Sequence, residues 1–274
     1  MADGPVAGQL ATRRVSCVPV GSWCGLACCL KKLGLREAAY PFDWNRTTLP
    51  AVVGFIQTRF SGFFDFMSVV DHAIPLGDAE PHGELVYRGR EHSIWHEDVR
   101  KPEEREKYER RIARFYDNPA ERILFIRAAN SDDELEEAPT LLEALDEKFP
   151  GKQVFLLMII DFQRSTSQNL VRFYNDRLLV FRNSIDLARY TGAQEGPYDK
   201  FVQAYEEPLL WAVEHVTLFP DVSWWSSRCS LSSLVNSSTA YMCGAPQLVP
   251  WRIDVDEMIL NGEDEEECWQ CHVQ

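Results

Sequence analysis

The sequence contains no long apolar run. The longest, residues 154–160, is too short to cross a bilayer, and residues 1–14 hold no apolar segment of signal-peptide length. We therefore expect a soluble, cytoplasmic protein whose thiols are mostly reduced. Positive charge is also scarce, since 28 Lys and Arg against 42 Asp and Glu give a net charge of −14. This balance argues against a nucleic-acid partner and against an anionic membrane surface.

The common cofactor signatures are absent as well. The chain has no internal repeat, no Walker loop, no GxGxxG and no HExxH, so nucleotide-binding and zincin functions have no support. The closing Cys268-Trp269-Gln270-Cys271-His272 matches half of a zinc site, but no second pair stands at zinc-module spacing. We therefore expect no cofactor and no metal. A metal-binding protein that uses Cys and His side chains stays an alternative.

What the sequence does have is enough apolar material for one large core. Its 274 residues are 45% hydrophobic and 12% aromatic, which is typical of a globular protein. We expect a flexible leader over residues 1–13, a single domain over 14–260 and an acidic, cysteine-containing tail over 261–274.

Two apolar runs, residues 122–128 and 153–162, predict buried strands, with a helix over 132–149 between them. Such runs are typical of parallel neighbours in a sheet that helices cover on both faces. The predicted fold class is therefore α/β, a single domain with a largely parallel or mixed sheet. Further helices are predicted over residues 49–60, 101–116 and 200–215, hairpins over 84–95 and 170–181, and a loop over 71–83.

The stretch from residue 15 to residue 35 is the centre of the prediction. It predicts a short strand, a Gly21-Ser22 turn and a helix that begins at or beside Cys24 and stops at Gly34. A thiol at a helix N-terminus lies near the positive end of the helix dipole, which favours the nucleophilic thiolate. Backbone N–H groups at the same turn are suited to an oxyanion. Cys24 is thus either a nucleophile or, like most cysteines, a buried apolar residue.

Other residues are assigned by their surroundings. Cys17, Cys28 and Cys29 are expected to be structural. Asp43 lies between Phe42 and Trp44, and a carboxylate in an apolar run either ties down its loop or lines the site near Cys24. Ser22, Trp23 and Arg127 are further candidates for substrate or oxyanion binding, because ligands gather at the carboxyl ends of parallel strands. Arg110, Arg111 and Arg114 either complement a helix dipole or reach an anionic substrate group.

Several motifs occur in an order that is familiar. They are Gly21-Ser22-Trp23-Cys24, Tyr40-Pro41-Phe42-Asp43-Trp44, His96-Glu97-Asp98, and Ile123-Leu124-Phe125-Ile126-Arg127. Together they resemble a family of unknown function described as papain-like cysteine peptidases, over about residues 15–165. The resemblance implies that Cys24 is the nucleophile and His96 its base, and it makes a papain-like α+β fold the alternative. The usual His-Asp pair is interrupted by Glu97, so either Glu97 or Asp98 orients His96.

The function predicted from the sequence is a cysteine-dependent hydrolase or acyltransferase that acts on an amide, ester or thioester of a small molecule or peptide. Cys24 attacks, His96 carries the proton and Asp98 fixes the imidazole, while N–H groups at Ser22 to Cys24 hold the oxyanion. The alternatives are a binding or interaction protein without catalysis, or a metal-binding protein. The sequence indicates no oligomeric state.

Overall fold

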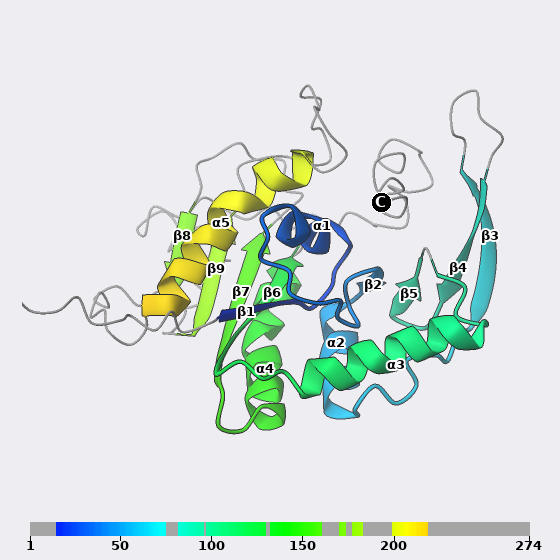
Figure 1. Cartoon of the computed structure of the whole chain (residues 1–274), viewed down its shortest axis with the longest axis horizontal. Coiled ribbons are helices and arrows are strands. Elements are labelled where there is room, and N and C mark those ends of the chain that lie inside the picture. The colour runs from blue at the N-terminus through cyan, green and yellow to red at the C-terminus, as the bar shows by residue number, and fades with distance from the viewer. Residues whose placement is uncertain are drawn as a thin grey trace, which may run out of the picture.

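The protein is built around two sheets that share one helical layer (Figure 1). The computed structural model describes residues 15–74, 82–95, 97–129, 132–160, 170–173, 177–182 and 199–218. The larger sheet has the order β1-β6-β7-β9-β8. Its strands are β1 (Val15–Pro19), β6 (Arg122–Ala129), β7 (Gln153–Ile160), β8 (Leu170–Phe173) and β9 (Leu178–Arg182). The first four in space run parallel, and β8 is antiparallel to β9.

Helices cover both faces of this sheet. They are α1 (Gly25–Lys32), α2 (Leu49–Gln57), α3 (Pro102–Tyr116), α4 (Asp132–Lys148) and α5 (Asp199–Leu218). In Figure 1, α1 and α5 lie on one side of the sheet, and α2 and α4 lie on the other. The predicted α/β fold with helices on both faces is confirmed.

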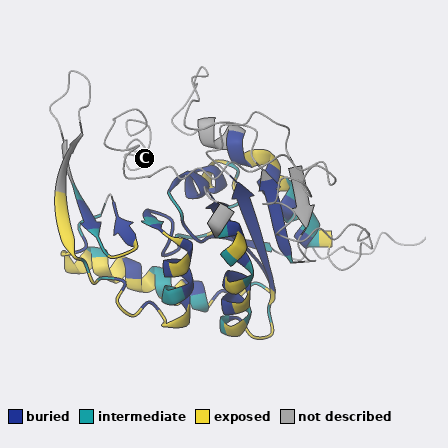
Figure 2. Ribbon diagram, turned by 180° about the vertical axis from the view of Figure 1, so that it is seen from behind, coloured by how far each residue is buried: buried dark blue, intermediate teal, exposed yellow. Residues whose placement is uncertain are grey.

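Alternation along the central strands produces two apolar cores. Ile123 and Phe125 of β6 point into the first cluster, with α2, α3 and α4, whereas Leu124 and Ile126 point into the second cluster, with α1 and α5. Figure 2 shows these strands as the most deeply buried part of the chain. Strands buried on both faces need continuous apolar sequence, which is why runs of apolar residues predicted them.

A smaller antiparallel sheet stands beside the first. It has the order β2-β5-β4-β3, with β2 (Asn45–Thr47), β3 (Ser68–Ile74), β4 (His82–Arg88) and β5 (His92–Ile94). The predicted hairpin is confirmed, because Tyr87 lies opposite Ile94. The predicted loop over residues 71–83 is wrong at both ends, since β3 extends to Ile74 and β4 begins at His82. The prolines and glycines of this stretch suggested a loop without strand pairing. In the structure, β3 and β4 pair over their full lengths, and this pairing satisfies their backbone N–H and C=O groups.

The end of α1 follows from one glycine. Leu35 N–H donates to the carbonyl of Leu30 at 2.9 Å, and Gly34 N–H donates to Lys31 at 3.2 Å. This is the Schellman pattern, and it requires a left-handed residue, which Gly34 supplies at φ +70°. The predicted stop of the helix at Gly34 is therefore confirmed.

An aromatic cluster anchors the loop between α1 and β2. Phe42 packs against Phe60, with ring centroids 5.1 Å apart, and edge-to-face against Phe115 of α3 at 6.2 Å. Both partners are buried. The loop that carries Asp43 and Trp44 is thus held by apolar packing on the α3 side. None of the helices in the described ranges is long and apolar enough to cross a membrane.

Candidate active site

The turn between β1 and α1 is fixed from β6. Val20 N–H donates to the carbonyl of Ile126 at 2.9 Å, which continues the β1–β6 pairing by one bond. Ser22 Oγ donates to the carbonyl of Ala128 at 2.9 Å. Between them Gly21 has φ +79° and a cis peptide bond to Ser22. The chain therefore leaves the sheet through a tightly held turn at the carboxyl end of the parallel strands.

Cys24 is the first residue after this turn and the N-cap of α1. Its carbonyl accepts the first helical hydrogen bond, from Cys28 N–H at 3.0 Å, and its side chain makes no capping bond. The predicted strand, turn and helix around Cys24 are thus confirmed as local structure. Cys24 is disulfide-bonded, so the expectation of mostly reduced thiols is not met at this residue.

The neighbouring cysteines differ from Cys24 in burial. Cys17 is 2% exposed and Cys28 and Cys29 are fully buried, whereas Cys24 is 9% exposed. None of these three neighbours is in a disulfide. Burial, together with the negative charge of Glu37, raises the pKa of Cys17 to about 12, and burial together with Glu206 does the same for Cys29. These thiols stay protonated near neutral pH, as expected of structural cysteines.

Trp23 links the turn to α5. Its indole Nε1 donates to the hydroxyl of Tyr205 at 3.2 Å, and its ring packs against the second cluster, to which Cys24 belongs. Of the predicted binding residues, Ser22 and Trp23 therefore lie at the turn itself. Their described bonds go to other parts of the protein, so the structure shows them as anchors of the turn.

Asp43 is fully buried and ties down its own loop. Its Oδ2 accepts from Arg36 Nη2 at 2.5 Å, from Arg36 Nε at 3.1 Å and from Tyr40 N–H at 3.0 Å. Burial raises the pKa of Asp43, although the Arg36 guanidinium acts in the opposite direction. The next residue, Trp44, packs in the second cluster with Cys24. The loop-tying role is what the structure shows, and a role in lining the site stays a prediction.

Both carboxylates that follow His96 are engaged with arginines. Glu97 forms a paired ion bridge with Arg111 of α3, at 2.8 Å and 2.6 Å. Asp98 accepts from Arg100 Nε at 3.0 Å and Nη2 at 3.1 Å, and from the Tyr87 hydroxyl. His96 itself lies outside the described residues. The role of His96 as the base for Cys24 therefore stays a prediction, as does its orientation by Glu97 or Asp98.

Arg127 is fully buried on β6. Its Nε pairs with Glu134 Oε2 at 2.7 Å, its Nη1 donates to the carbonyl of Val20 at 3.0 Å and its Nη2 to the carbonyl of Thr47 at 2.8 Å. Each of its three nitrogens thus donates to a protein acceptor. These bonds show that Arg127 supports the turn, and its role in binding a substrate or oxyanion stays a prediction.

Sequence reasoning did not find two partners of this region, Arg36 and Glu134. Glu134 lies in the predicted helix over residues 132–149, and Arg36 follows Gly34, but neither was given a partner. Arg111 was expected either to complement a helix dipole or to reach an anionic substrate group, whereas in the structure it binds the carboxylate of Glu97, beside His96. The one usable signal was a charged residue in an apolar context, which marked Asp43 as needing partners.

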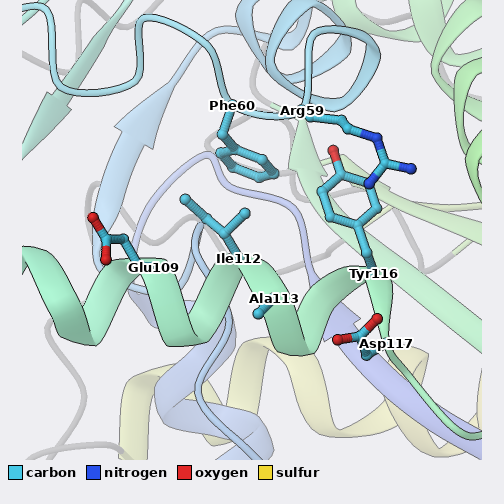
Figure 3. A pocket seen from close by; sticks show the side chains of 7 residues that line it. All are labelled: Arg59, Phe60, Glu109, Ile112, Ala113, Tyr116 and Asp117. Atoms are coloured by element: carbon cyan, nitrogen blue, oxygen red, sulfur yellow. The ribbon is translucent and has the colours of Figure 1, made fainter.

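A groove of about 450 Å³ lies apart from Cys24, between Arg59 and the last turns of α3 (Figure 3). Phe60 and Ile112 form its apolar wall, and the Arg59 guanidinium lies over the ring of Tyr116, 5.0 Å from its centroid. These apolar residues pack in the first cluster, whereas Cys24 belongs to the second. The groove is therefore not part of the candidate active site.

Within the described ranges, no group of three or more His, Cys, Asp or Glu side chains is placed to hold a metal ion. Residues 261–274, with Cys268, Cys271 and His272, lie outside these ranges. Metal binding by these three residues therefore stays an alternative drawn from the sequence.

Fold and site together define an α/β protein with a cysteine at a strand–turn–helix junction. The chain matches, over residues 15–165, the family model described as "Putative papain-like cysteine peptidase (DUF1796)". Because the match covers more than half of the 274 residues, the protein belongs to this family. Searches among curated proteins and among solved structures gave no match.

The family match confirms the resemblance drawn from the motifs, including its span. It also supports an enzyme of the cysteine hydrolase class, because that is what the family description names. The mixed sheet with its four parallel strands shows which of the two expected folds the chain adopts, namely the α/β arrangement.

Proposed function

We propose that the protein is a cysteine-dependent hydrolase or acyltransferase acting on an amide, ester or thioester, with Cys24 as nucleophile. One observation carries the proposal: of the four cysteines in residues 17–29, Cys24 alone stands at a helix N-terminus beside a fixed turn. All four are buried, but the other three lie within a strand or within the helix. A helix N-terminus lowers the pKa of a thiol, whereas burial raises it.

In the proposed reaction the Cys24 thiolate adds to the carbonyl carbon of the substrate. Backbone N–H groups at Ser22 to Cys24 receive the oxyanion. His96 takes the proton of the thiol and gives it to the departing amine, alcohol or thiol, which leaves a thioester on Cys24. Water, or an acceptor amine or alcohol, then attacks this thioester and regenerates the thiol. Asp98 or Glu97 orients the imidazole.

The disulfide at Cys24 sets a condition on this chemistry. A sulfur bound to another sulfur has no lone thiolate to offer, so the nucleophile forms only after reduction. The same disulfide is the observation that favours the alternative function, a binding protein in which Cys24 serves structure. The two functions differ in what reduction produces, a reactive thiolate in the first and an ordinary thiol in the second.

The test is alkylation of the fully reduced protein with iodoacetamide between about pH 5 and about pH 9, with each adduct located by peptide mass spectrometry. We expect Cys24 to react first, with an apparent pKa well below about 8.5, the ordinary value for cysteine. Hydrolysis of p-nitrophenyl acetate, an activated ester, should be lost in Cys24→Ala and kept in Cys28→Ala. Cys28 is the matched control, one helical turn further on and fully buried.

Cys24→Ala should leave the melting temperature of the reduced protein nearly unchanged. A large loss of stability, with ordinary alkylation of Cys24 in the parent protein, would establish the binding protein instead. His96→Ala tests the base separately: it should slow ester hydrolysis while Cys24 remains the first residue alkylated.

A further inference from the structure

Three consecutive residues of β6 hold Val20 and Ser22 in the turn before Cys24. The carbonyls of Ile126 and Ala128 accept from Val20 N–H and Ser22 Oγ, each at 2.9 Å. Between these two bonds, Arg127 Nη1 donates to the carbonyl of Val20 at 3.0 Å. In two of these three contacts β6 contributes only a backbone carbonyl, which a residue of any type at Ile126 or Ala128 would supply. The third depends on the side chain of Arg127.

The same guanidinium reaches two further elements. Nη2 donates to the carbonyl of Thr47 in β2, which belongs to the smaller sheet, at 2.8 Å. Nε pairs with Glu134 of α4 at 2.7 Å, and Glu134 is 14% exposed. Arg127 thus joins the turn, the second sheet and α4 at one point. A fully buried cation needs such a counterion and such acceptors, because unpaired burial is costly.

The guanidinium also limits where the turn can run. A Cβ built on Gly21 would lie 2.7 Å from Arg127 Nη1, closer than real Cβ contacts. The backbone of Gly21 therefore packs directly on the guanidinium. A planar group with donors in a fixed fork holds one carbonyl of the turn and one of β2, whereas a lysine ammonium does not reproduce that fork.

We propose that Arg127, oriented by Glu134, is the positioning residue of the Cys24 site. It fixes the path of residues 20–22 and through them the place of the Cys24 sulfur at the first turn of α1. It contacts no reacting atom, so this role differs from the substrate-binding role predicted from the sequence. Its consequence for catalysis rests on the proposed function, but its consequence for the reactivity of Cys24 does not.

Arg122 provides a matched control on the same strand. It is 1% exposed and lies at the other end of β6, where its Nη1 donates to the carbonyls of Val216 at 2.5 Å and Thr217 at 2.8 Å. Arg122→Lys and Arg127→Lys therefore make the same chemical change at equal burial. Only the second change touches the turn.

The experiment compares Arg127→Lys, Arg122→Lys and Glu134→Gln, as full chains after reduction, by thermal unfolding and by the pH profile of Cys24 alkylation. Both lysine variants should melt at lower temperature. Only Arg127→Lys should raise the apparent pKa of Cys24, by about one unit, which slows alkylation near neutral pH about tenfold. Glu134→Gln keeps an acceptor for Nε but removes its charge, and should slow alkylation by a smaller factor.

An Arg127→Lys profile identical to that of the parent protein would overturn the proposal, as would an equal shift in Arg122→Lys. If Arg127→Lys does not fold, Glu134→Gln decides: an unchanged profile in that variant overturns the proposal. The outcome is separable from that of the proposed function. Ordinary reactivity of Cys24 in the parent protein ends the catalytic proposal, whereas a reactive Cys24 that ignores Arg127 ends only this one.

Discussion

The two ends of the larger sheet use the same residue types for different purposes. The carboxyl end has Gly21 at φ +79° and the buried Arg127, and the amino end has Gly151 at φ +79° and the buried Arg122. At the amino end the arginine binds carbonyls in the last turn of α5, and nothing lies within 4 Å of a Cβ at Gly151. At the carboxyl end the arginine and the glycine pack against each other.

This difference shows that residue type and burial do not set the role of a side chain. Arg122 fastens a helix to the sheet, whereas Arg127 fastens the turn that precedes a cysteine. Both stabilise the fold, but only the second is placed to change the chemistry of a reactive group. The comparison therefore predicts which substitutions alter stability alone and which alter Cys24 as well.

The largest expected effect is the difference in alkylation rate between Cys24 and the buried thiols of Cys17 and Cys29. Burial raises the pKa of Cys17 and Cys29 to about 12, so about one thiol in a thousand is ionised near pH 9. In the reduced protein, iodoacetamide at that pH should modify Cys24 and leave Cys17 and Cys29 unmodified until the protein unfolds. Peptide mass spectrometry of the time course measures this. Equal modification of Cys17 and Cys24 in the folded protein would mean that the carboxyl end confers no special reactivity.

The next largest effect is the loss of stability when Gly21 or Gly151 is replaced by alanine. Gly21→Ala places a Cβ 2.7 Å from Arg127 at a φ of +79°, so strain and steric overlap add. We expect a loss of about 3 kcal/mol in the free energy of unfolding, with slower alkylation of Cys24. Gly151→Ala has the same φ but open space, and should lose about 1 kcal/mol with no change at Cys24.

Urea unfolding of the reduced variants provides both free energies. If the two alanine variants lose equal stability, the guanidinium of Arg127 moves aside without cost, and the turn is held less firmly than its contacts indicate.

The smallest effect is at Asp98. Hydrogen bonds from Arg100 and from the Tyr87 hydroxyl hold the pKa of Asp98 well below its usual value. A carboxyl whose pKa is lowered on folding stabilises the folded state above its unfolded pKa, about 3.9, and loses that contribution as the pH falls below it. Asp98→Asn should therefore lower the melting temperature slightly near neutral pH, and the difference from the parent protein should shrink progressively as the pH falls below about 3.9.

Asp98 also bears on the site. If its bonds to Arg100 and Tyr87 are its only role, Asp98→Asn leaves ester hydrolysis at the parental rate near neutral pH. A marked loss of hydrolysis with a small change in melting temperature would assign Asp98 to the orientation of His96 and remove Glu97 from that role.

Much of the fold could be predicted because short stretches of sequence specify its strands and helix ends. Apolar runs predicted β6 and β7, and Gly34 marked the end of α1. The strand, turn and helix around Cys24 were predictable for the same reason. The smaller sheet was predicted only in part, because the pairing of β2 with β5 joins residues far apart in the chain. Turn-forming residues after β3 also led to a predicted loop from residue 71, whereas β3 extends to Ile74.

The members of the candidate site and their roles stay predictions. Ser22, Trp23, Asp43 and Arg127 were all selected, yet the bonds the structure gives them go to other parts of the protein. The pairing of Glu97 with Arg111 was not predicted, because nothing in either local sequence specifies the other. The roles of His96 and Asp98 in catalysis stay predictions.

The sequence by itself determined that a cysteine begins a helix after a glycine turn, because φ preferences, dipoles and apolar periodicity act within a few residues. Only the tertiary structure decided what holds that turn. Arg127 is 107 residues from Val20, and its charge finds Glu134 and Thr47 only when the two sheets and α4 meet. A buried cation binds whatever acceptors the folded chain brings within about 3 Å, and no local rule specifies which these are.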